Sequence, residues 1–243
     1  LKHDASILLP EIGRLDHAIG YGVSQTGRML RHFLHLGLNV DEQGRKVFDG
    51  LLPHVAGARM GAFNNRYAQP SNQSYPAFGH LFPFTDADLP DPFSNNSDGI
   101  MTRLRELDAE PKIIYTNSSA EYWRGDSSLL HTDPGASRDL ESEENTRIYH
   151  FAGTQHNAGV LPLGHTQPTG ASGLHPFNWV DWRPLMRAAV ANLDAWVSNN
   201  TTPPASKHAR LDDGTAVPSE SLESVFQAFP GFGFPDHLRH VTR

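Results

Sequence analysis

The feature that most constrains the fold is the stretch AIGYGVSQTGRML at residues 18–30. A short apolar run ends at Gly22, a serine follows at position 24, and a helical pattern begins at Thr26. A strand that ends in Gly-x-Ser-x-small and turns at once into a helix forms a nucleophile elbow. Small residues must flank the serine, because larger side chains would collide with the neighbouring strand and helix. Gly22 meets this requirement, whereas Thr26 stands where glycine is commoner, so a serine that merely caps a helix is the competing interpretation.

An acid and a histidine follow the serine in the order that such an elbow requires. The β-rich run KIIYT at residues 112–116 is followed by Glu121, and the run RIYHF at residues 147–151 is followed by His156. The backbone N–H of Gln25, directly after the serine, is the expected oxyanion donor. We therefore predict a Ser24–Glu121–His156 triad in which each residue lies just past the end of a strand.

Other carboxylates and histidines compete for these roles. Asp126 and Asp133 also follow the run at residues 112–116, so either is an alternative to Glu121 as the acid. His32 and His35 share a predicted helix at a spacing of three residues, but no HExxH pattern accompanies them. We therefore expect no metal site.

Aromatic residues near these motifs have two interpretations. Phe82, Phe84 and Trp123 are candidates for an apolar substrate pocket, and they fit equally well as packing between a long loop and the sheet. Residues 61–98 are rich in Asn, Pro, Phe, Ser and Asp, which predicts a long irregular excursion or lid.

The remaining hydrophobic pattern alternates between strands and helices. Four strands and four helices are expected, and this alternation favours an α/β fold with a mainly parallel sheet flanked by helices. The predicted strands cover residues 18–21, 51–56, 112–116 and 147–151, and the predicted helices cover residues 5–17, 26–36, 98–107 and 182–197.

Composition excludes several classes of function. The formal net charge of −7 and the lack of a basic stripe argue against a general nucleic-acid binder. There is no cysteine, so disulfides, thiolate metal sites and a cysteine nucleophile are excluded. No apolar run approaches the length that spans a bilayer. The compartment of the protein is not indicated.

The motifs together resemble a known family. The segments GYGVSQTGRMLRHFLHLGLNV, PKIIYTNSSAEYWRGDSSLLHTDP and RIYHFAGTQH, within residues 15–217, are similar to an alpha/beta hydrolase domain family of the α/β-hydrolase superfamily. The resemblance implies an α/β-hydrolase fold with Ser24 as the nucleophile, Glu121 as the acid and His156 as the base. It implies no cofactor and no particular substrate.

The sequence departs from this fold in one respect. An α/β hydrolase has the first half of its sheet before the elbow, whereas only 23 residues precede Ser24 here. We therefore expect residues 1–243 to be the C-terminal catalytic portion of one such domain. A preceding segment of the same polypeptide, or another chain, is expected to complete the sheet and to supply the second oxyanion donor.

The expected activity is hydrolysis of a carboxylic ester, small or polymeric, through an acyl-enzyme. An amidase or peptidase, or a polyester depolymerase, would use the same triad. A catalytically silent α/β-hydrolase fold that binds a ligand or partner is the alternative outside enzymes.

Overall fold

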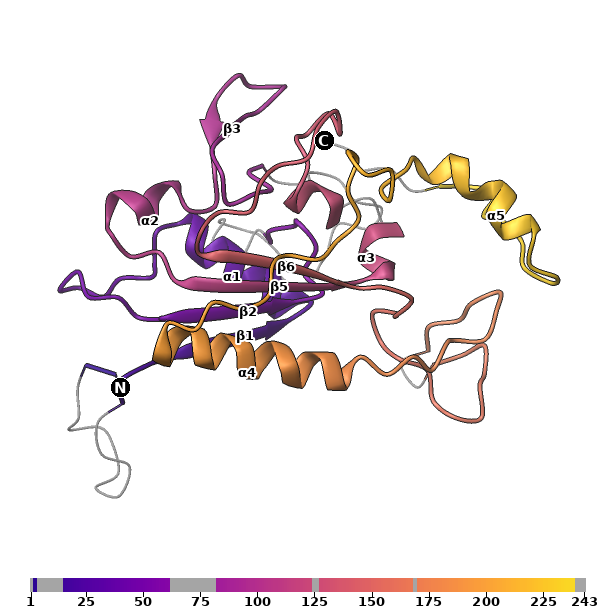
Figure 1. Cartoon of the computed structure of the whole chain (residues 1–243), viewed down its shortest axis with the longest axis horizontal. Coiled ribbons are helices and arrows are strands. Elements are labelled where there is room, and N and C mark those ends of the chain that lie inside the picture. Colours follow the sequence, from indigo (N-terminus) through magenta and orange to yellow (C-terminus); the bar gives the residue numbers. More distant parts are fainter. Residues whose placement is uncertain (1, 4–14, 62–81, 124–126, 168–169, 239–243) are drawn as a thin grey trace.

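The computed structural model describes residues 2–3, 15–61, 82–123, 127–167 and 170–238. Its centre is a four-stranded sheet in which every neighbouring pair is parallel, with the strand order β1-β2-β5-β6 (Figure 1). This sheet confirms the predicted α/β class. The strands are β1 (Ile19–Val23), β2 (Gly50–His54), β5 (Lys112–Ser118) and β6 (Thr146–Phe151).

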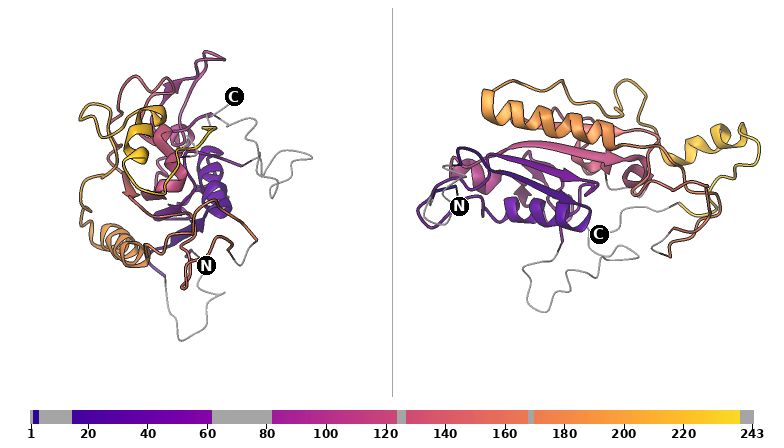
Figure 2. Two further views of the ribbon diagram at one scale, coloured as in Figure 1. Left: turned by 90° about the vertical axis from the view of Figure 1, so that its right-hand side faces the viewer. Right: turned by 90° about the horizontal axis from the view of Figure 1, so that it is seen from below.

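Helices cover both faces of the sheet. Helix α1 (Gln25–His35) packs on β1 and β2, and α4 (Arg183–Asn199) packs on the opposite face of β2 and β5 (Figure 2). Successive residues of a strand point to opposite faces. Leu51 therefore joins the hydrophobic cluster under α1, and Leu52 joins the cluster under α4. Both faces of the central strands are apolar because both are covered.

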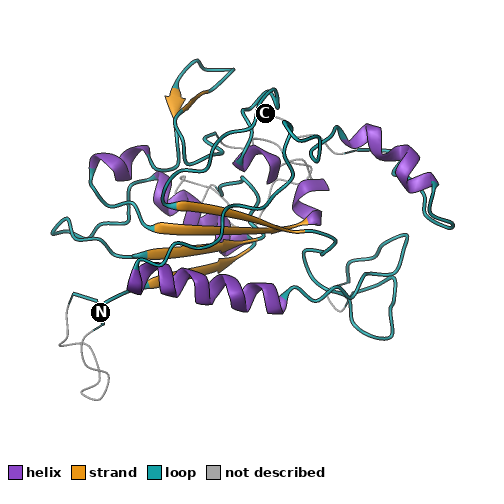
Figure 3. Cartoon of the chain, in the orientation of Figure 1, coloured by secondary structure: helices purple, strands orange, loops and turns teal. Residues whose placement is uncertain are grey.

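Helix α2 (Thr102–Glu106) and the 3₁₀ turn η2 (Ser127–Leu130) lie on the same face of the sheet as α1, because their leucines join its hydrophobic cluster, and α5 (Glu223–Gln227) lies beyond the end of the sheet (Figure 3). Most of the predicted helix at residues 5–17 lies outside the described residues. Helix α2 is shorter than predicted at its start, because Ser97 and Asp98 are held in an extended strand and Gly99 binds the side chains of Asp98 and Thr102. The remaining short elements are helix α3 (Ser119–Trp123) and the 3₁₀ turn η3 (Ser219–Leu222).

The predicted excursion at residues 61–98 is described only in part, since residues 62–81 lie outside the described residues. In the part from residue 82 onward, the chain is irregular except for a small antiparallel pair, β3 (Leu89–Pro90) and β4 (Ser97–Asp98). A role of this excursion as a lid stays a prediction.

The two edges of the sheet differ. Strand β1 pairs only with β2 in the described part of the chain, so the other strands of this sheet all lie on one side of it. Its residues Ile19, Tyr21 and Val23 are exposed. The opposite edge is covered, because Lys207 exchanges backbone hydrogen bonds with β6. That further strands complete the β1 edge stays a prediction.

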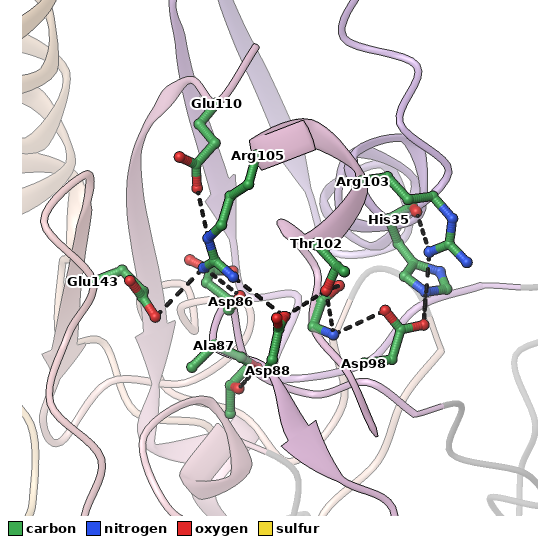
Figure 4. Close-up of polar contacts among 12 residues, drawn as sticks. His35, Asp86, Ala87, Asp88, Asp98, Thr102, Arg103, Arg105, Glu110 and Glu143 are labelled. Carbon is green, nitrogen blue, oxygen red and sulfur yellow. Dashed lines mark hydrogen bonds and ion pairs between the residues drawn. The ribbon is translucent and has the colours of Figure 1, made fainter. Parts of the chain in front are cut away.

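Charged side chains gather at the amino end of the sheet, where β5 and β6 begin. The guanidinium of Arg105 forms ion pairs with Asp88 at 3.2 Å, Glu110 at 3.2 Å and Glu143 at 3.4 Å (Figure 4). These acids precede different strands or belong to the excursion, so one cation ties together loops that are distant in sequence.

Beneath this cation, a buried carboxylate joins two strands. Asp86 accepts hydrogen bonds from the Tyr115 hydroxyl at 2.7 Å and from the Thr146 hydroxyl at 2.6 Å. Tyr115 belongs to β5 and Thr146 to β6, so Asp86 fixes the excursion to the sheet. None of the helices in the described residues is long and apolar enough to cross a membrane.

Candidate active site

Ser24 occupies the turn between β1 and α1. Its backbone angles are φ 54° and ψ −112°, a positive-φ conformation outside the regular helix and strand regions that costs a non-glycine residue roughly 1–3 kcal/mol. The backbone N–H of Ser24 donates to the carbonyl of His54 at 2.8 Å, which anchors the turn to β2. The serine side chain makes no capping hydrogen bond to α1. Helix capping therefore does not explain why a serine stands here.

The residues around Ser24 show why the turn tolerates this sequence. A Cβ on Gly22 would lie 2.7 Å from backbone atoms of Thr26, so only glycine fits there. Thr26, where glycine is commoner, folds its side chain back onto the strand: its hydroxyl contacts the N–H of Val23 at 2.8 Å and the carbonyl of Val23 at 2.9 Å. These two hydrogen bonds of Thr26 stabilise the turn between β1 and α1.

Glu121 lies on α3, directly after β5, and its side chain is fully buried. One carboxylate oxygen accepts hydrogen bonds from the backbone N–H and the hydroxyl of Ser118. The other oxygen lies 2.7 Å from Nδ1 of His156. The structure thus brings together two of the three residues that the sequence nominated for the triad.

His156 lies on the loop after β6, and about a quarter of its side chain is exposed. The start of α3 holds this loop at two points. The Ser119 hydroxyl accepts a hydrogen bond from the N–H of Gly153 at 2.9 Å, and the N–H of Ser119 donates to the carbonyl of Thr154 at 3.2 Å. The loop that carries the histidine and the helix that carries the acid are therefore fixed to each other.

Ser24 reaches the same edge of the sheet through the strand register. Val23 pairs with His54, and His54 pairs with Thr116, so the ends of these strands lie level. No hydrogen bond joins the Ser24 hydroxyl to His156 among the residues that the structure describes. Catalytic hydrogen bonds are often long in enzymes without substrate, so contact between Ser24 and His156 stays a prediction.

His54 is a second histidine at this edge, and it is completely buried. Its Nδ1 lies 2.9 Å from the Thr116 hydroxyl, and its ring centroid lies 4.4 Å from that of Trp182. Burial lowers the pKa of His54 to about 4; the nearby Glu121 charge opposes this shift, and His156 adds to it. His54 is therefore neutral near pH 7 and places no positive charge beside Glu121 and His156.

The competing acids lie elsewhere or are not described. Asp126 is outside the described residues. Asp133 accepts hydrogen bonds from the backbone N–H groups of Ser137 at 2.7 Å and Arg138 at 2.8 Å, so it stabilises its own turn. Glu121 is the carboxylate that contacts His156.

The three candidate pocket residues fall in two different places. Phe84 is buried in the hydrophobic core, and Phe82 packs edge-on against it with ring centroids 6.0 Å apart, which fits the packing interpretation. Trp123 instead lines a cavity of about 340 Å³ between α3, β6 and the C-terminal segment, and its ring packs edge-on against Phe226. A role of these rings in substrate binding stays a prediction.

Gln25, the expected oxyanion donor, is the first residue of α1. The first N–H groups of a helix have no acceptor inside that helix, and the first turn here carries no acidic residue, so the position suits a developing negative charge. Among the described residues, no three potential metal ligands gather in one place. His35 is paired with Asp98 at 2.8 Å.

Sequence reasoning missed Ser118, Ser119 and His54. Ser118 and Ser119 stand in the stretch before Glu121, and a hydroxyl next to a predicted catalytic acid is a signal that could have drawn attention to them. His54 gave no such signal, because only the pairing of β2 between β1 and β5 brings it to the site.

Comparisons with known proteins agree with this architecture. A family model described as "Alpha/beta hydrolase domain" matches residues 2–226. Comparisons with curated proteins and with solved structures gave no match. The family match spans most of the sequence, and the parallel sheet flanked by helices is the structure that the family implies. The chain therefore belongs to the alpha/beta hydrolase domain family.

Proposed function

We propose that this protein is a serine hydrolase that cleaves a carboxylic ester, with Ser24 as nucleophile, His156 as base and Glu121 as the acid that orients it. The observation that carries the proposal is the 2.7 Å contact between His156 Nδ1 and the buried carboxylate of Glu121. A carboxylate in this position holds the imidazole in the tautomer whose Nε2 can accept a proton from a serine.

The reaction has two halves. His156 Nε2 removes the proton of the Ser24 hydroxyl while the oxygen attacks the carbonyl carbon, and the resulting oxyanion accepts a hydrogen bond from the Gln25 N–H. His156 then gives its proton to the departing alcohol, which leaves an acyl-enzyme. Water, activated by the same histidine, attacks the acyl carbon and releases the acid and the free serine.

The environment of the carboxylate supports its role. Two hydrogen bonds from Ser118 fix one oxygen of Glu121, so the other oxygen is directed at His156. A buried carboxylate with these partners stabilises the imidazolium that forms during attack. Because His54 is neutral, it adds no competing positive charge beside that imidazolium.

A fluorophosphonate probe tests the nucleophile, since it phosphonylates an activated serine. We expect labelling of the wild-type protein and none of Ser24→Ala. Ser119→Ala is the matched control, because the Ser119 hydroxyl also contacts a histidine, His150, at 3.1 Å. Label mapped to Ser119 would refute the proposal by assigning the nucleophile to that serine. No label on a folded wild-type protein would refute it and favour a catalytically silent binding protein.

A substrate panel then tests the bond that is cleaved. The panel pairs a p-nitrophenyl ester, the matching p-nitroanilide and a polyester film of the same acyl group. We expect hydrolysis of the ester in solution. Preferential hydrolysis of the anilide or the film would replace the ester assignment with an amidase or a polyester depolymerase.

A further inference from the structure

Several large apolar side chains beside the candidate site face solvent. We call the following set the apolar rim: four residues of the loop between β6 and α4, and two residues after α5. Each exposes between 46% and 84% of its surface, although apolar side chains of this size are usually buried. The rim residues are Leu161, Leu163, Leu174, Trp179, Phe229 and Phe232.

The two parts of the rim project from the same end of the molecule. The loop and the α5 segment both lie beyond α3, at the end where β5 and β6 finish (Figures 1 and 2). The rings of His175 in the loop and Phe232 after α5 contact each other with centroids 5.0 Å apart. His156 lies on this same loop, between the end of β6 and Leu161, so the candidate catalytic histidine and the first rim residues belong to one segment.

The rim is also free of formal charge. Residues 157–180 contain no Asp, Glu, Lys or Arg, and neither do residues 228–235, although 19% of the whole chain is charged. A protein–protein interface usually surrounds its apolar centre with polar and charged groups that select one partner. Docking on the surface of an uncharged lipid phase requires apolar area on the protein but no complementary charges, because the fluid lipid adapts to the shape of the protein.

We infer that the apolar rim docks the protein on an uncharged lipid–water interface, from which an ester of the lipid enters the site. This inference rests on the proposed function for the last step only. The net charge of −7 opposes binding to anionic surfaces, so the lipid surface that fits is neutral or zwitterionic. The substrate class is then a water-insoluble lipid ester.

Vesicle flotation tests the docking without any need for catalysis. The full chain carrying Ser24→Ala is mixed with phosphatidylcholine vesicles at low and high salt. We expect it to float with the vesicles, with no loss of binding at high salt. The double variant Leu161→Asp/Leu174→Asp should reduce the partition coefficient at least about tenfold, because two exposed aliphatic side chains that would enter the lipid surface are replaced by charges.

The matched control is Leu38→Asp/Leu107→Asp. These leucines are as exposed as Leu163 but follow α1 and α2 at the other end of the sheet, so vesicle binding should be unchanged. Absence of flotation, equal losses in both double variants, or binding only to anionic vesicles would overturn the inference. Binding to polyester particles alone would also overturn the inference. Self-association through the rim in place of vesicle binding would overturn it as well.

The activity of the wild-type protein separates this inference from the proposed function. On tributyrin, the rim variant should lose most of its rate above the solubility limit and keep the wild-type rate below it. Hydrolysis of soluble ester without vesicle binding would overturn the docking and leave the proposed function standing. Vesicle binding without hydrolysis of any ester would overturn the proposed function and leave the docking standing.

Discussion

The two ends of the parallel sheet are built from different interactions. At the amino end, Arg105 pairs with three carboxylates (Figure 4), and Asp86 accepts hydrogen bonds from hydroxyls of β5 and β6. At the carboxyl end, one buried carboxylate contacts one histidine, a serine is held in a strained turn, and residues 157–180 of the adjoining loop contain no Asp, Glu, Lys or Arg.

This difference shows that the two ends of the sheet contribute to different properties. Ion pairs and hydrogen-bonded hydroxyls at the amino end hold the crossover segments together and so stabilise the fold. The carboxyl end keeps a conformation that is locally unfavourable at Ser24, and such strain persists only where the surroundings impose it. Mutations at the two ends should therefore separate activity from stability, and the following predictions test that separation.

The largest effect is expected from the proposed nucleophile and base. Ser24→Ala and His156→Ala should each lower kcat for ester hydrolysis by about five to six orders of magnitude, and the double variant should be little worse, because the residues act as one unit. The melting temperature should change little. Steady-state kinetics with active-site titration measures the losses, and losses that multiply in the double variant would show two independent roles.

A smaller loss is expected from the acid. Glu121→Gln keeps the shape of the side chain but favours the wrong imidazole tautomer, so kcat should fall about 10⁴-fold. Asp133→Asn is the matched control, because Asp133 binds only its own turn, and it should leave kcat within about twofold of the wild-type value. A large loss in Asp133→Asn with none in Glu121→Gln would reverse the assignment.

At the amino end the effect should fall on stability instead. Asp86→Ala leaves the buried hydroxyls of Tyr115 and Thr146 without their acceptor, which should lower the free energy of unfolding by about 2–4 kcal/mol. The value of kcat, measured well below the melting temperature, should match the wild type. Urea unfolding gives the first quantity, and a parallel loss of kcat in folded Asp86→Ala would break the comparison between the two ends.

The smallest effect is a dependence of stability on pH that originates at the carboxyl end. His131, after η2, is buried and stacks on His208 at 3.9 Å; burial, followed by the His208 charge, lowers the pKa of His131 from 6.5 to about 3. Between these values the unfolded chain binds a proton that the folded chain does not. Stability therefore falls as pH falls, by up to about 1.4 kcal/mol per pH unit.

His131→Gln removes this titration and keeps a side chain that can hydrogen-bond to Tyr122. We expect the slope of the unfolding free energy against pH, between pH 6 and pH 5, to be smaller in the variant by about 1.4 kcal/mol per pH unit. Urea unfolding at the two pH values measures it. An unchanged slope would assign the acid sensitivity to other groups, such as those of the amino end.

Much of the candidate site could be predicted because its signals are local. Gly22 is required by a steric contact within four residues, and the order of serine, acid and histidine along the chain is visible without any tertiary information. The positions of the strands were predicted to within a few residues for the same reason, since each carries its own run of apolar residues.

The packing of the aromatic residues was not decided by the sequence. Phe84 is a core residue and Trp123 lines a cavity, yet both stand in similar stretches of polar and aromatic residues. Whether an aromatic ring faces the core or a cavity depends on which segment covers it. That covering segment comes from elsewhere in the chain, as Phe226 does for Trp123.

The sequence by itself determined the fold class, the elbow and the identity of the three candidate catalytic residues, because turn sterics and strand patterns act over a few neighbouring residues. Only the tertiary structure decided that β2 lies between β1 and β5, and hence that His54 lies buried beside Glu121 and His156. Parallel strands are joined by long crossovers, so neighbours in the sheet are far apart in sequence. Contacts across the sheet edge therefore appear only once the strands are paired.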